Sequence, residues 1–589
     1  MIKLIKNFRR QDFLSLLIFI GISIILYRCI TLQYLETEKW SSNIEAREIK
    51  PHKIVASRGV IVDRNNEILA ESILLETLGT TDPKFFLENN SEKDIKYLCN
   101  IIDKNYASLK RTLLSNKNKR FLFIGRQLSE DQINRIRKLN LKGVGYQKEF
   151  QRFYPWGESI GNLVGKTDKD HVGQNGLEKS YDSYLKGKDG KSKVRQDRNG
   201  KIVENIKLLS PAKDGKKLTL TIDARLQYVA YRELKNKIEE VNAKSGSVII
   251  LDTTNGDILA SASYPSYDPN DKYSYTNFKE RNRGIIDPIE PASTIKPFLL
   301  SAALYSGSVR LNHTFDTNPG YLKIDGHKYR DFKNYGLLTS EGVVIKSSNV
   351  GSVKISQKFN KKIYHDLLEY IGVGEMINIK FPSEESGKLD HYSEWDKKDT
   401  RSHAIGYALT MTPLQIAKAY SVIANEGMVI NPRINKDLLT QKYKSKKYKS
   451  SFKKAREVIK KVVESGTGRN AALKGYTVGG KTGTAEVYNK KYNKNKHNSL
   501  FAGIIPISEP KLVIVVVINE PENKPNQFYG SFVSAPVFKR IASDSLRILN
   551  ISPDNVLDNT KRVSNKIENF DITTIKTTED NYVFWIKWY

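Results

Sequence analysis

One continuous apolar segment near the N-terminus constrains the chain more than any other feature. Residues 13–27, FLSLLIFIGISIILY, are apolar or small, and extension through RCITL gives about 20 residues, enough to span a bilayer. Basic residues precede it, namely Lys3, Lys6, Arg9 and Arg10. A cleaved signal peptide is the alternative, but no A-x-A-like site follows the apolar run. We expect an uncleaved membrane helix over 13–35, a cytoplasmic segment 1–12, and the remaining chain outside the cytoplasm.

The composition of the remaining chain indicates a large multidomain protein. A chain of 589 residues with 39% hydrophobic content forms more than one core, since single cores seldom grow past about 250–300 residues. The net charge is +31, but the lysines are scattered through Asn- and Tyr-rich stretches, so we expect a solvated basic surface and no nucleic-acid partner. Attraction to anionic lipid headgroups or to an acidic wall polymer stays open. Two cysteines imply no disulfide framework, and eight histidines without ligand-like spacing predict no metal and no cofactor.

Sequence patterns divide the exported part into three segments. Residues 36–210 combine the strand-turn-strand pattern of ASRGVIVDRNNEILAES with helical charge patterns, which predicts a modest domain. Over 211–550 the chain shows a strand followed by an amphipathic helix, a hairpin that turns at Asn255-Gly256, a helical middle and the apolar run KLVIVVVINEP. A sheet built from both ends around the helical middle is the simplest arrangement, hence α/β or α+β. Residues 551–589 are predicted to form a loosely ordered tail.

The stretch DPIEPASTIKPFLLSAAL, residues 287–304, contains a Ser-x-x-Lys pair with two interpretations. In the first, Ser293 caps a buried helix whose start lies between two prolines, and Lys296 is solvated. In the second, the two side chains share a helix face, and the amine is a base within hydrogen-bond reach of the hydroxyl. The pattern alone does not decide, because it also occurs at Ser183, Ser210, Ser450, Ser451 and Ser508.

Two further motifs follow in order along the chain. IKSSNVGSV, about 50 residues downstream, places Ser347 and Asn349 in a Ser-x-Asn, and VGGKTGTAEV, about 130 further on, contains residues 481–484 as Lys-Thr-Gly-Thr. Each residue alone has an ordinary structural interpretation as a cap, an exposed lysine or a β-branched strand residue. Those interpretations give no reason for three motifs to occur in this order along the chain. We therefore expect the motifs to form one nucleophilic site.

The first part of this expected site activates the nucleophile. A helix that begins at Ser293 directs unpaired N–H groups and the positive end of its dipole toward the hydroxyl. Lys481 adds a second cation, and two ammonium groups close together lower at least one pKa, which makes a neutral Lys296 base plausible. Ser347, between the two lysines, is placed to relay a proton to a leaving amine.

The second part binds an extended peptide. Asn349 offers a donor and an acceptor for a peptide amide. Gly483 lets a substrate backbone approach the strand closely and add beside it, with the N–H groups of Ser293 and Thr484 as the oxyanion hole. The hydroxyls of Thr482 and Thr484 suit a substrate carboxylate, with charge supplied by Lys481.

The three motifs resemble those of the active-site serine penicillin-binding proteins of the monofunctional class B type. The resemblance covers roughly residues 13–545 and includes RGVIVDRNNEILA, RFYPWGESIGNLVG, GQNGLEKSYDSYLKG, LTLTIDARLQ, YALTMTPLQIAKAYSVIANEG and FAGIIPISEPKLVIVVVINEP. RNRGIIDPIEPASTIKP and KSSNVG are more similar to the cell-division type, penicillin-binding protein 3, than to the elongation-specific penicillin-binding protein 2. Ala292 and Ala408 stand where the family usually has glycine; we expect the first to restrict the helix entry and the second to affect a loop and not the chemistry.

The resemblance implies a fold, an activity and partners. The fold is a transpeptidase domain over 211–550, with a central antiparallel sheet and helices on both sides, preceded by an elongated α+β pedestal of the dimerisation type over 36–210. Ser293 is acylated by the penultimate D-Ala of a peptidoglycan stem peptide, and an amine of a neighbouring stem then forms the cross-link; β-lactams acylate the same serine. The implied location is the inner membrane at the division septum, as a single-pass protein with a periplasmic catalytic domain. A SEDS-family glycosyltransferase and other division proteins are the implied partners.

Several other functions stay open at this point. An elongation-type transpeptidase, a D,D-carboxypeptidase and a β-lactamase differ in whether an amine or water resolves the acyl-enzyme, and no general-base signature for fast hydrolysis is recognisable. Outside enzymes, the chain is a division scaffold with a dispensable site, or a sensor of β-lactam or stem peptide. Only about 12 residues precede the membrane helix, which argues against a sensor with a cytoplasmic output domain.

Overall fold

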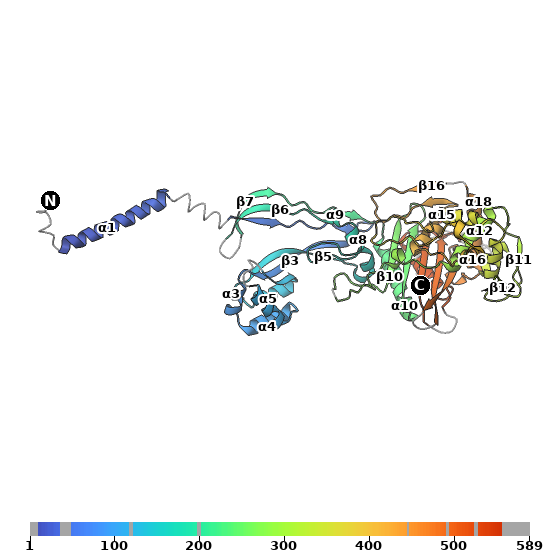
Figure 1. Cartoon of the computed structure of the whole chain (residues 1–589), viewed down its shortest axis with the longest axis horizontal. Helices are drawn as coiled ribbons and strands as arrows, with labels where there is room; N and C mark the ends of the chain where they lie inside the picture. Colours follow the sequence, from blue (N-terminus) through green and yellow to red (C-terminus); the bar gives the residue numbers. More distant parts are fainter. Residues whose placement is uncertain are drawn as a thin grey trace, which may run out of the picture.

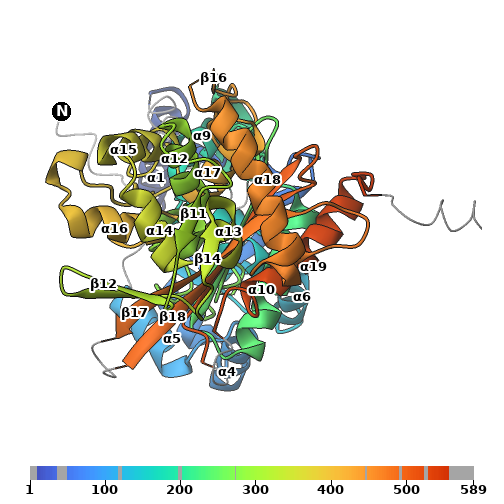
Figure 2. The ribbon, with the colours of Figure 1, turned by 90° about the vertical axis from the view of Figure 1, so that its right-hand side faces the viewer.

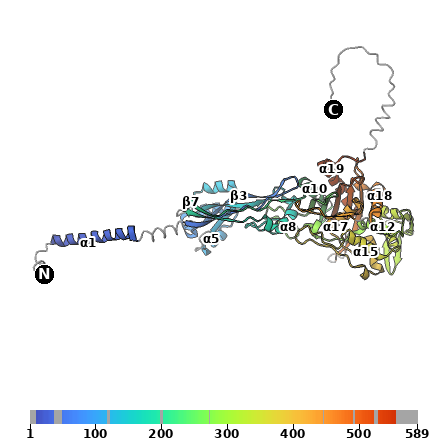
Figure 3. The same ribbon diagram turned by 90° about the horizontal axis from the view of Figure 1, so that it is seen from above.

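The computed structural model describes residues 10–35, 49–116, 122–196, 202–271, 273–444, 447–489, 494–522 and 528–555. The elements follow one another along a long axis, from helix α1 through a slender pedestal to a wider C-terminal domain (Figures 1 and 3). Helix α1 (Arg10–Ile30) continues into the π-helical turn η1 (Thr31–Leu35). The segment Phe13–Tyr34 has a mean hydropathy of 2.4, and its most apolar 18-residue window contains no buried residue, so the segment is long and apolar enough to cross a membrane.

The pedestal comprises the described residues from 49 to 220 and contains two sheets and a helical head. One sheet has the order β4-β3-β2-β8 with β5 also paired to β3, and the other has the order β1-β6-β7. The strands are β1 (Ile49–Ile54), β2 (Ile61–Val62), β3 (Ile68–Thr80), β4 (Leu122–Leu128), β5 (Gly145–Phe153), β6 (Gly190–Gln196), β7 (Ile202–Ser210) and β8 (Leu218–Thr219). Strand β8 pairs in parallel with β2, so the pedestal sheet continues past the boundary predicted at residue 210.

The head of the pedestal packs amphipathic helices over β3 and β4. These helices are α3 (Pro83–Asn89), α4 (Glu92–Ile101), α5 (Tyr106–Ser115) and α6 (Glu130–Arg137). Asp82, Ser91, Asn105 and Ser129 cap them by accepting hydrogen bonds from N–H groups of the first turns. Closer to the C-terminal domain lie the short helices η2 (Gly157–Ser159), α7 (Gly161–Val164), α8 (Gly176–Ser180) and α9 (Asp182–Leu185).

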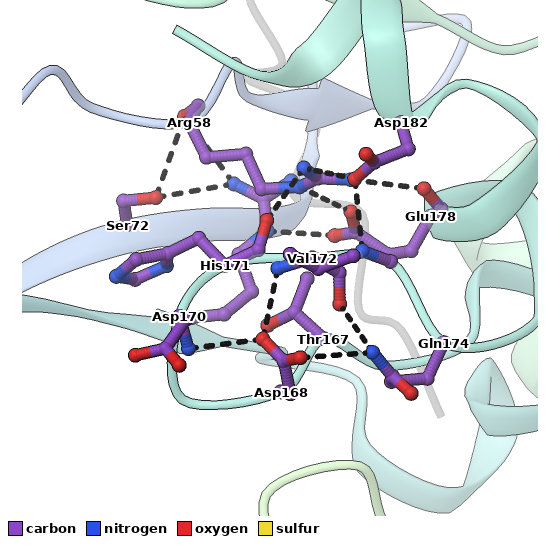
Figure 4. Close-up of polar contacts among 12 residues, drawn as sticks. Arg58, Ser72, Thr167, Asp168, Asp170, His171, Val172, Gln174, Glu178 and Asp182 are labelled. Carbon is purple, nitrogen blue, oxygen red and sulfur yellow. Dashed lines mark hydrogen bonds and ion pairs between the residues drawn. The ribbon is translucent and has the colours of Figure 1, made fainter. Parts of the chain in front are cut away.

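A buried ionic cluster holds three distant segments of the pedestal together (Figure 4). The two oxygens of Glu178 on α8 accept hydrogen bonds from Arg58 Nε at 2.6 Å and Arg152 Nε at 2.7 Å. Arg58 also donates to Asp182 Oδ1 at 2.7 Å and to the carbonyl oxygen of His171 at 2.9 Å. We call these residues the junction cluster; in it, two buried guanidinium groups are balanced by two carboxylates.

The C-terminal domain is built on a five-stranded, wholly antiparallel sheet of order β10-β9-β19-β18-β17. Its strands are β9 (Ser245–Asp252), β10 (Ile258–Tyr264), β17 (Gly479–Asn489), β18 (Lys494–Ile505) and β19 (Leu512–Asn519). The apolar run predicted to be central is β19. Val513, Val515 and Val517 face one core, and Ile514, Val516 and Ile518 face the other. Because strand side chains alternate, a continuous apolar run lets one strand serve two cores.

Helices cover both faces of this sheet, which confirms the predicted fold class. Helices α10 (Ala224–Glu240) and α19 (Ser534–Ile548) close one core, and the helical middle closes the other. The middle comprises α11 (Arg283–Ile286), η3 (Ala292–Ile295), α12 (Lys296–Tyr305), α13 (Ser340–Lys346), α14 (Asn349–Ser356), α15 (Lys361–Tyr370), η4 (Tyr392–Glu394), α16 (Lys397–Ile405), α17 (Pro413–Ala424), α18 (Lys449–Ser465) and η5 (Arg469–Ala471). Short strand pairs lie among them: β11 (Thr314–Asp316) with β14 (Leu337–Thr339), β12 (Tyr321–Ile324) with β13 (His327–Arg330), and β15 (Met428–Ile430) with β16 (Lys442–Lys444). Figure 2 looks onto α12, α13 and α14, beside the β17–β18 end of the sheet.

The start of the predicted tail is attached to the C-terminal domain. Tyr476 Oη donates to the carbonyl oxygen of Ile551 at 2.7 Å, and the side chain of Asp554 accepts the backbone N–H of Thr477 at 2.7 Å. Residues 551–555 therefore belong to the domain, and the rest of the predicted tail lies outside the described residues.

Candidate active site

The three predicted motifs meet beside β17, the strand at one edge of the sheet. Lys296 is the first residue of α12, Ser347 follows the last turn of α13, and Asn349 begins α14. Lys296 Nζ donates to Asn349 Oδ1 at 2.7 Å and to the carbonyl oxygen of Ser347 at 2.8 Å. Lys481 Nζ on β17 donates to Ser347 Oγ at 2.9 Å. Segments separated by 53 and 134 residues are thus joined through two amines.

Ser293 lies in a 3-10 turn that leads into α12, and its hydroxyl is not a helix cap. The turn η3 spans Ala292–Ile295, and no side-chain cap hydrogen bond closes its start. The residue is half-buried, and its hydroxyl makes no hydrogen bond within the described part of the chain. The sequence placed Lys296 within reach of this hydroxyl; in the structure the amine is instead bonded to Ser347 and Asn349. A free, partly accessible hydroxyl at the start of a helix is the arrangement that a nucleophile requires.

The two alanines that replace family glycines both adopt left-handed backbone conformations. Ala292 has φ 48° and Ala408 has φ 64°. The N–H of Ala292 donates to the carbonyl oxygen of Gly406 at 3.0 Å. The loop that contains Ala408 is therefore attached to η3, the turn that contains Ser293, which we call the nucleophile turn. A side chain in this region of φ costs free energy that glycine avoids, so the predicted restriction at Ala292 has a structural basis in backbone strain. The loop of Ala408 also lies nearer the site than the sequence suggested.

Lys296 is fully buried, and its surroundings favour the neutral amine. Burial lowers the pKa of Lys296 to about 7, although the nearby charge of Asp331 raises it in part. A neutral amine keeps two N–H donors and one lone pair. Its two donors are taken by Ser347 and Asn349, which leaves the lone pair to accept a proton.

Lys481 is also fully buried, and it has more acceptors. Its Nζ is 2.9 Å from Ser347 Oγ, 2.9 Å from the carbonyl oxygen of Thr482 and 3.3 Å from Thr482 Oγ1. Burial and the charge of Lys296 lower the pKa of Lys481 well below its usual value. Among the described residues neither amine forms an ion pair with a carboxylate, so the two lysines titrate as a coupled pair that does not hold two full charges at low cost.

Asp331 and Thr467 complete the site, and motif analysis missed both. One oxygen of Asp331, just after β13, accepts the backbone N–H groups of Asn349 at 2.5 Å and Val350 at 3.0 Å. The other accepts the Ser348 hydroxyl at 2.6 Å, so Asp331 caps α14 and fixes the Ser-x-Asn segment. Thr467 Oγ1 lies 2.8 Å from Thr482 Oγ1. The short sequences around these two residues, RDF (330–332) and SGTG (465–468), match no motif that indicates a particular chemistry. Only the contacts in the folded structure identify Asp331 and Thr467.

Gly483 also allows close packing within the protein itself. A Cβ on this residue would lie 3.0 Å from Thr294 Cγ2 and 3.2 Å from the carbonyl oxygen of Pro291, both in or next to the nucleophile turn. The sequence assigned this glycine to the approach of a substrate; the structure adds that it lets β17 pack against η3. Thr484 Oγ1 accepts the N–H of Gly530 at 3.2 Å. Strand β17 is the edge strand of the sheet, so among the described residues only β18 pairs with it.

The chemistry available here is acyl transfer through serine. The site contains the free hydroxyl of Ser293 and the buried amine of Lys296, whose lone pair is available. It also contains the amine of Lys481, which is hydrogen-bonded to the Ser347 hydroxyl, and the side-chain amide of Asn349. The only candidate metal group in the described chain, on α15, includes none of these residues. All eight residues predicted from the motifs lie in or beside this site: Ser293, Lys296, Ser347, Asn349, Lys481, Thr482, Gly483 and Thr484.

Comparison with known proteins agrees with this chemistry. The family model of the penicillin binding protein transpeptidase domain matches residues 246–543, and that of the penicillin-binding protein dimerisation domain matches residues 53–220. Probable peptidoglycan D,D-transpeptidase PbpC of Pseudomonas aeruginosa is 35% identical over 533 residues, which cover 90% of this chain and 94% of that protein. Peptidoglycan D,D-transpeptidase FtsI of Escherichia coli is 34% identical over 545 residues, with 91% of each chain covered. A peptidoglycan synthetase structure from Bifidobacterium adolescentis has a TM-score of 0.66 at 23% identity, over 87% of this chain and 98% of that one, and shows the shared fold.

Proposed function

This chain belongs to the penicillin-binding protein family of peptidoglycan D,D-transpeptidases, and from that premise we propose how its own residues carry out the reaction. Ser293 Oγ attacks the carbonyl carbon of the penultimate D-Ala of a stem peptide. The C–N bond to the terminal D-Ala breaks and leaves an acyl-enzyme ester. An amine of a neighbouring stem then attacks this ester, releases Ser293 and completes the cross-link. β-Lactams acylate the same hydroxyl.

The observation that carries this proposal is the hydrogen bonding of Lys296. Both N–H donors of a neutral amine are used by Ser347 and Asn349, and a pKa of about 7 makes that neutral form abundant at neutral pH. Lys296 thus takes the proton of Ser293 as the hydroxyl attacks. The second amine, Lys481, holds the Ser347 hydroxyl, which acts as a relay: it passes its proton to the departing amine of D-Ala and regains the proton that Lys296 took from Ser293.

Substrate binding uses the edge strand. The donor peptide adds beside β17, and Asn349 Nδ2 contributes to its amide binding after leaving its present acceptor, the carbonyl oxygen of Arg330 at 2.9 Å. The hydroxyls of Thr482 and Thr484 bind the terminal carboxylate, with charge from Lys481. The N–H groups of Ser293 and Thr484 stabilise the oxyanion, which is worth about 3–4 kcal/mol per donor in acyl-transfer enzymes.

The cellular role we propose is cross-linking at the division septum. The domain assignment is a cytoplasmic segment 1–12, a membrane helix 13–35, a pedestal 36–210, a transpeptidase domain 211–550 and a tail 551–589, with the catalytic domain in the periplasm. The contacts of β8 extend the pedestal to residue 219, and those of residues 551–555 extend the transpeptidase domain to residue 555. The support is the apolar helix preceded by basic residues and the similarity to FtsI. Strand polymerisation is then left to a SEDS-family glycosyltransferase, contacted together with other division proteins through the helix and the pedestal.

Intact-protein mass spectrometry with a fluorescent penicillin tests the nucleophile. The full chain, solubilised in detergent, is incubated with the penicillin beside Ser293→Ala and the control Ser306→Ala, which removes a half-buried serine near the end of α12. We expect one stable adduct in the native protein and in the control, and none in Ser293→Ala. An adduct that survives in Ser293→Ala contradicts the proposal. An adduct that water removes rapidly favours a β-lactamase.

Replacement in cells separates the transpeptidase from the other roles. Ser293→Ala protein that still supports division at normal abundance would favour the scaffold. Failure of septation points to the division role, whereas loss of lateral growth would identify the elongation type. Release of D-Ala without cross-linked product would identify a carboxypeptidase.

A further inference from the structure

A cluster of potential metal ligands lies on α15, in a part of the C-terminal domain that the proposed reaction does not use. His365, Asp366 and Glu369 offer one imidazole nitrogen and two carboxylate oxygens, and these atoms all lie within 4.8 Å of one another. Helix α15 packs against α12 in the helical layer (Figure 2). Glu369 is four positions from His365 and three from Asp366, so it can meet both side chains only where the segment is helical, and no ligand spacing in the sequence reveals the group.

His365 has an unused ring nitrogen at the centre of this group. The residue is 2% exposed, and its Nδ1 has no hydrogen-bond partner in the described part of the chain. Glu369 Oε2 lies 3.4 Å from this nitrogen, a contact that is an ion pair only when the imidazole is protonated. Buried polar atoms nearly always make a hydrogen bond, so an imidazole nitrogen that faces a carboxylate without one needs an explanation. A cation bound between the two atoms supplies one.

The separation of these two atoms suits zinc coordination. With bonds of about 2.0–2.1 Å, ligand atoms in a tetrahedral zinc site lie about 3.4 Å apart. The side chain of Glu369 is 55% exposed, so the site is open to an incoming ion and to water in the remaining positions. A nitrogen ligand with carboxylates favours zinc and neighbouring transition metals over calcium or magnesium.

The ring of His365 is held in place by its neighbours. His391, Tyr392 and Trp395 surround it in edge-to-face arrangements, with ring centroids 5.3, 5.5 and 5.5 Å away. A ligand whose orientation is fixed by packing loses little freedom when it binds, which raises affinity.

The third potential ligand, Asp366, already binds a cation, the ammonium group of Lys362. Lys362 Nζ lies 2.8 and 2.9 Å from the two oxygens of Asp366, one helical turn away. The lysine side chain is 51% exposed, and such surface pairs are weak and readily exchanged. The ammonium group therefore competes with a metal ion for Asp366.

We propose that His365, Asp366 and Glu369 form a binding site for one divalent transition-metal ion, zinc foremost, from which the ion displaces Lys362. The ligands are His365 Nδ1, one oxygen of Glu369 and one oxygen of Asp366, and water completes the coordination. The site is separate from the transpeptidase centre, and its test does not depend on the proposed reaction.

The test is a titration of the tag-free, detergent-solubilised full chain with Zn²⁺ against a competing chromophoric chelator, and with Co²⁺ followed by its visible absorption. We expect one equivalent to bind in a saturable manner. Glu369→Gln should weaken binding by at least the 10–100-fold typical of losses in metal-site support, and His365→Ala should abolish it. Glu369→Gln alters an exposed side chain and keeps the fold even where His365→Ala does not; circular dichroism checks both.

The competing lysine gives an effect of the opposite sign. Lys362→Met should tighten zinc binding several-fold, because Asp366 no longer has a resident cation. The matched controls are His327→Ala, an exposed histidine on β13, and Lys96→Met, which breaks a similar exposed pair with Glu92 on α4. Both should leave binding unchanged. Native affinity in Glu369→Gln, or no gain in Lys362→Met, overturns the proposal.

Discussion

Two regions of this molecule bury a pair of cations, and they do so in opposite ways. In the junction cluster, the side chains of Arg58 and Arg152 are 1% and 2% exposed, and both donate to one carboxylate, Glu178. In the active site, Lys296 and Lys481 are fully buried, and their hydrogen bonds go to hydroxyl, amide and carbonyl oxygens. The number of cations and the degree of burial match, but the counter-charge differs.

The choice of residue explains the difference. Arginine does not lose its proton in proteins, so a buried arginine pair must be neutralised by carboxylates. Lysine can lose its proton, so burial without a bonded carboxylate produces a neutral amine. The first arrangement fixes three chain segments, and the second leaves an amine with a lone pair for the proposed proton transfer.

The largest effect is expected when the base is removed. Lys296→Met keeps the volume of the side chain but removes its lone pair, so acylation of Ser293 by a fluorescent penicillin should slow by on the order of 10⁴-fold, equivalent to about 5 kcal/mol. The free energy of unfolding should change by less than about 2 kcal/mol, because two lost hydrogen bonds are offset by removal of a desolvated amine. Stopped-flow acylation and urea denaturation measure the two quantities. A variant that acylates normally shows that another group is the base.

At the junction cluster, the loss of the shared carboxylate is expected to lower stability. Glu178→Gln leaves both arginines buried without their shared counter-charge, which should cost about 3–5 kcal/mol of unfolding free energy. The matched control is Glu204→Gln, which breaks an exposed pair with Arg195 and should cost no more than about 1 kcal/mol. Chemical denaturation of both variants gives the comparison. Equal losses of unfolding free energy in the two variants would show that burial does not determine how much the junction cluster contributes to stability.

A smaller effect is expected from pH. Because the folded pKa of Lys296 is about 7, acylation should rise about tenfold per pH unit below 7 and level off above it, as the amine loses its proton. The sign for stability follows from linkage. Between the folded pKa of about 7 and the ordinary value of 10.5, the unfolded chain binds a proton that the folded chain does not, so the contribution of Lys296 to stability rises with pH. A rate of acylation that is independent of pH below 7 would contradict the neutral-base role.

The sequence predicted most of the groups that the structure brings together at the candidate site, because the order of three motifs is a constraint that local structure does not impose. It also predicted β19 as central, since seven consecutive apolar residues must face two cores. It did not predict Asp331 or Thr467, whose roles arise from contacts between segments far apart in the chain. The sequence also did not predict that His365 Nδ1 is buried without a hydrogen bond, because this depends on how three aromatic rings pack around the side chain.

The smallest effect is expected at Ala292, where the sequence revealed the residue and only the structure revealed its backbone. With φ 48°, alanine pays a steric cost of about 1–2 kcal/mol that glycine avoids, while glycine loses about 0.5–1 kcal/mol more conformational entropy on folding. Ala292→Gly should therefore stabilise the protein by up to about 1 kcal/mol, seen as a rise in Tm. The control is Ala302→Gly on α12, a buried helical alanine, which should destabilise by about 1 kcal/mol or more. Ala292→Gly that lowers Tm would show that the turn beside Ser293 is not strained and that its methyl group stabilises the turn by packing.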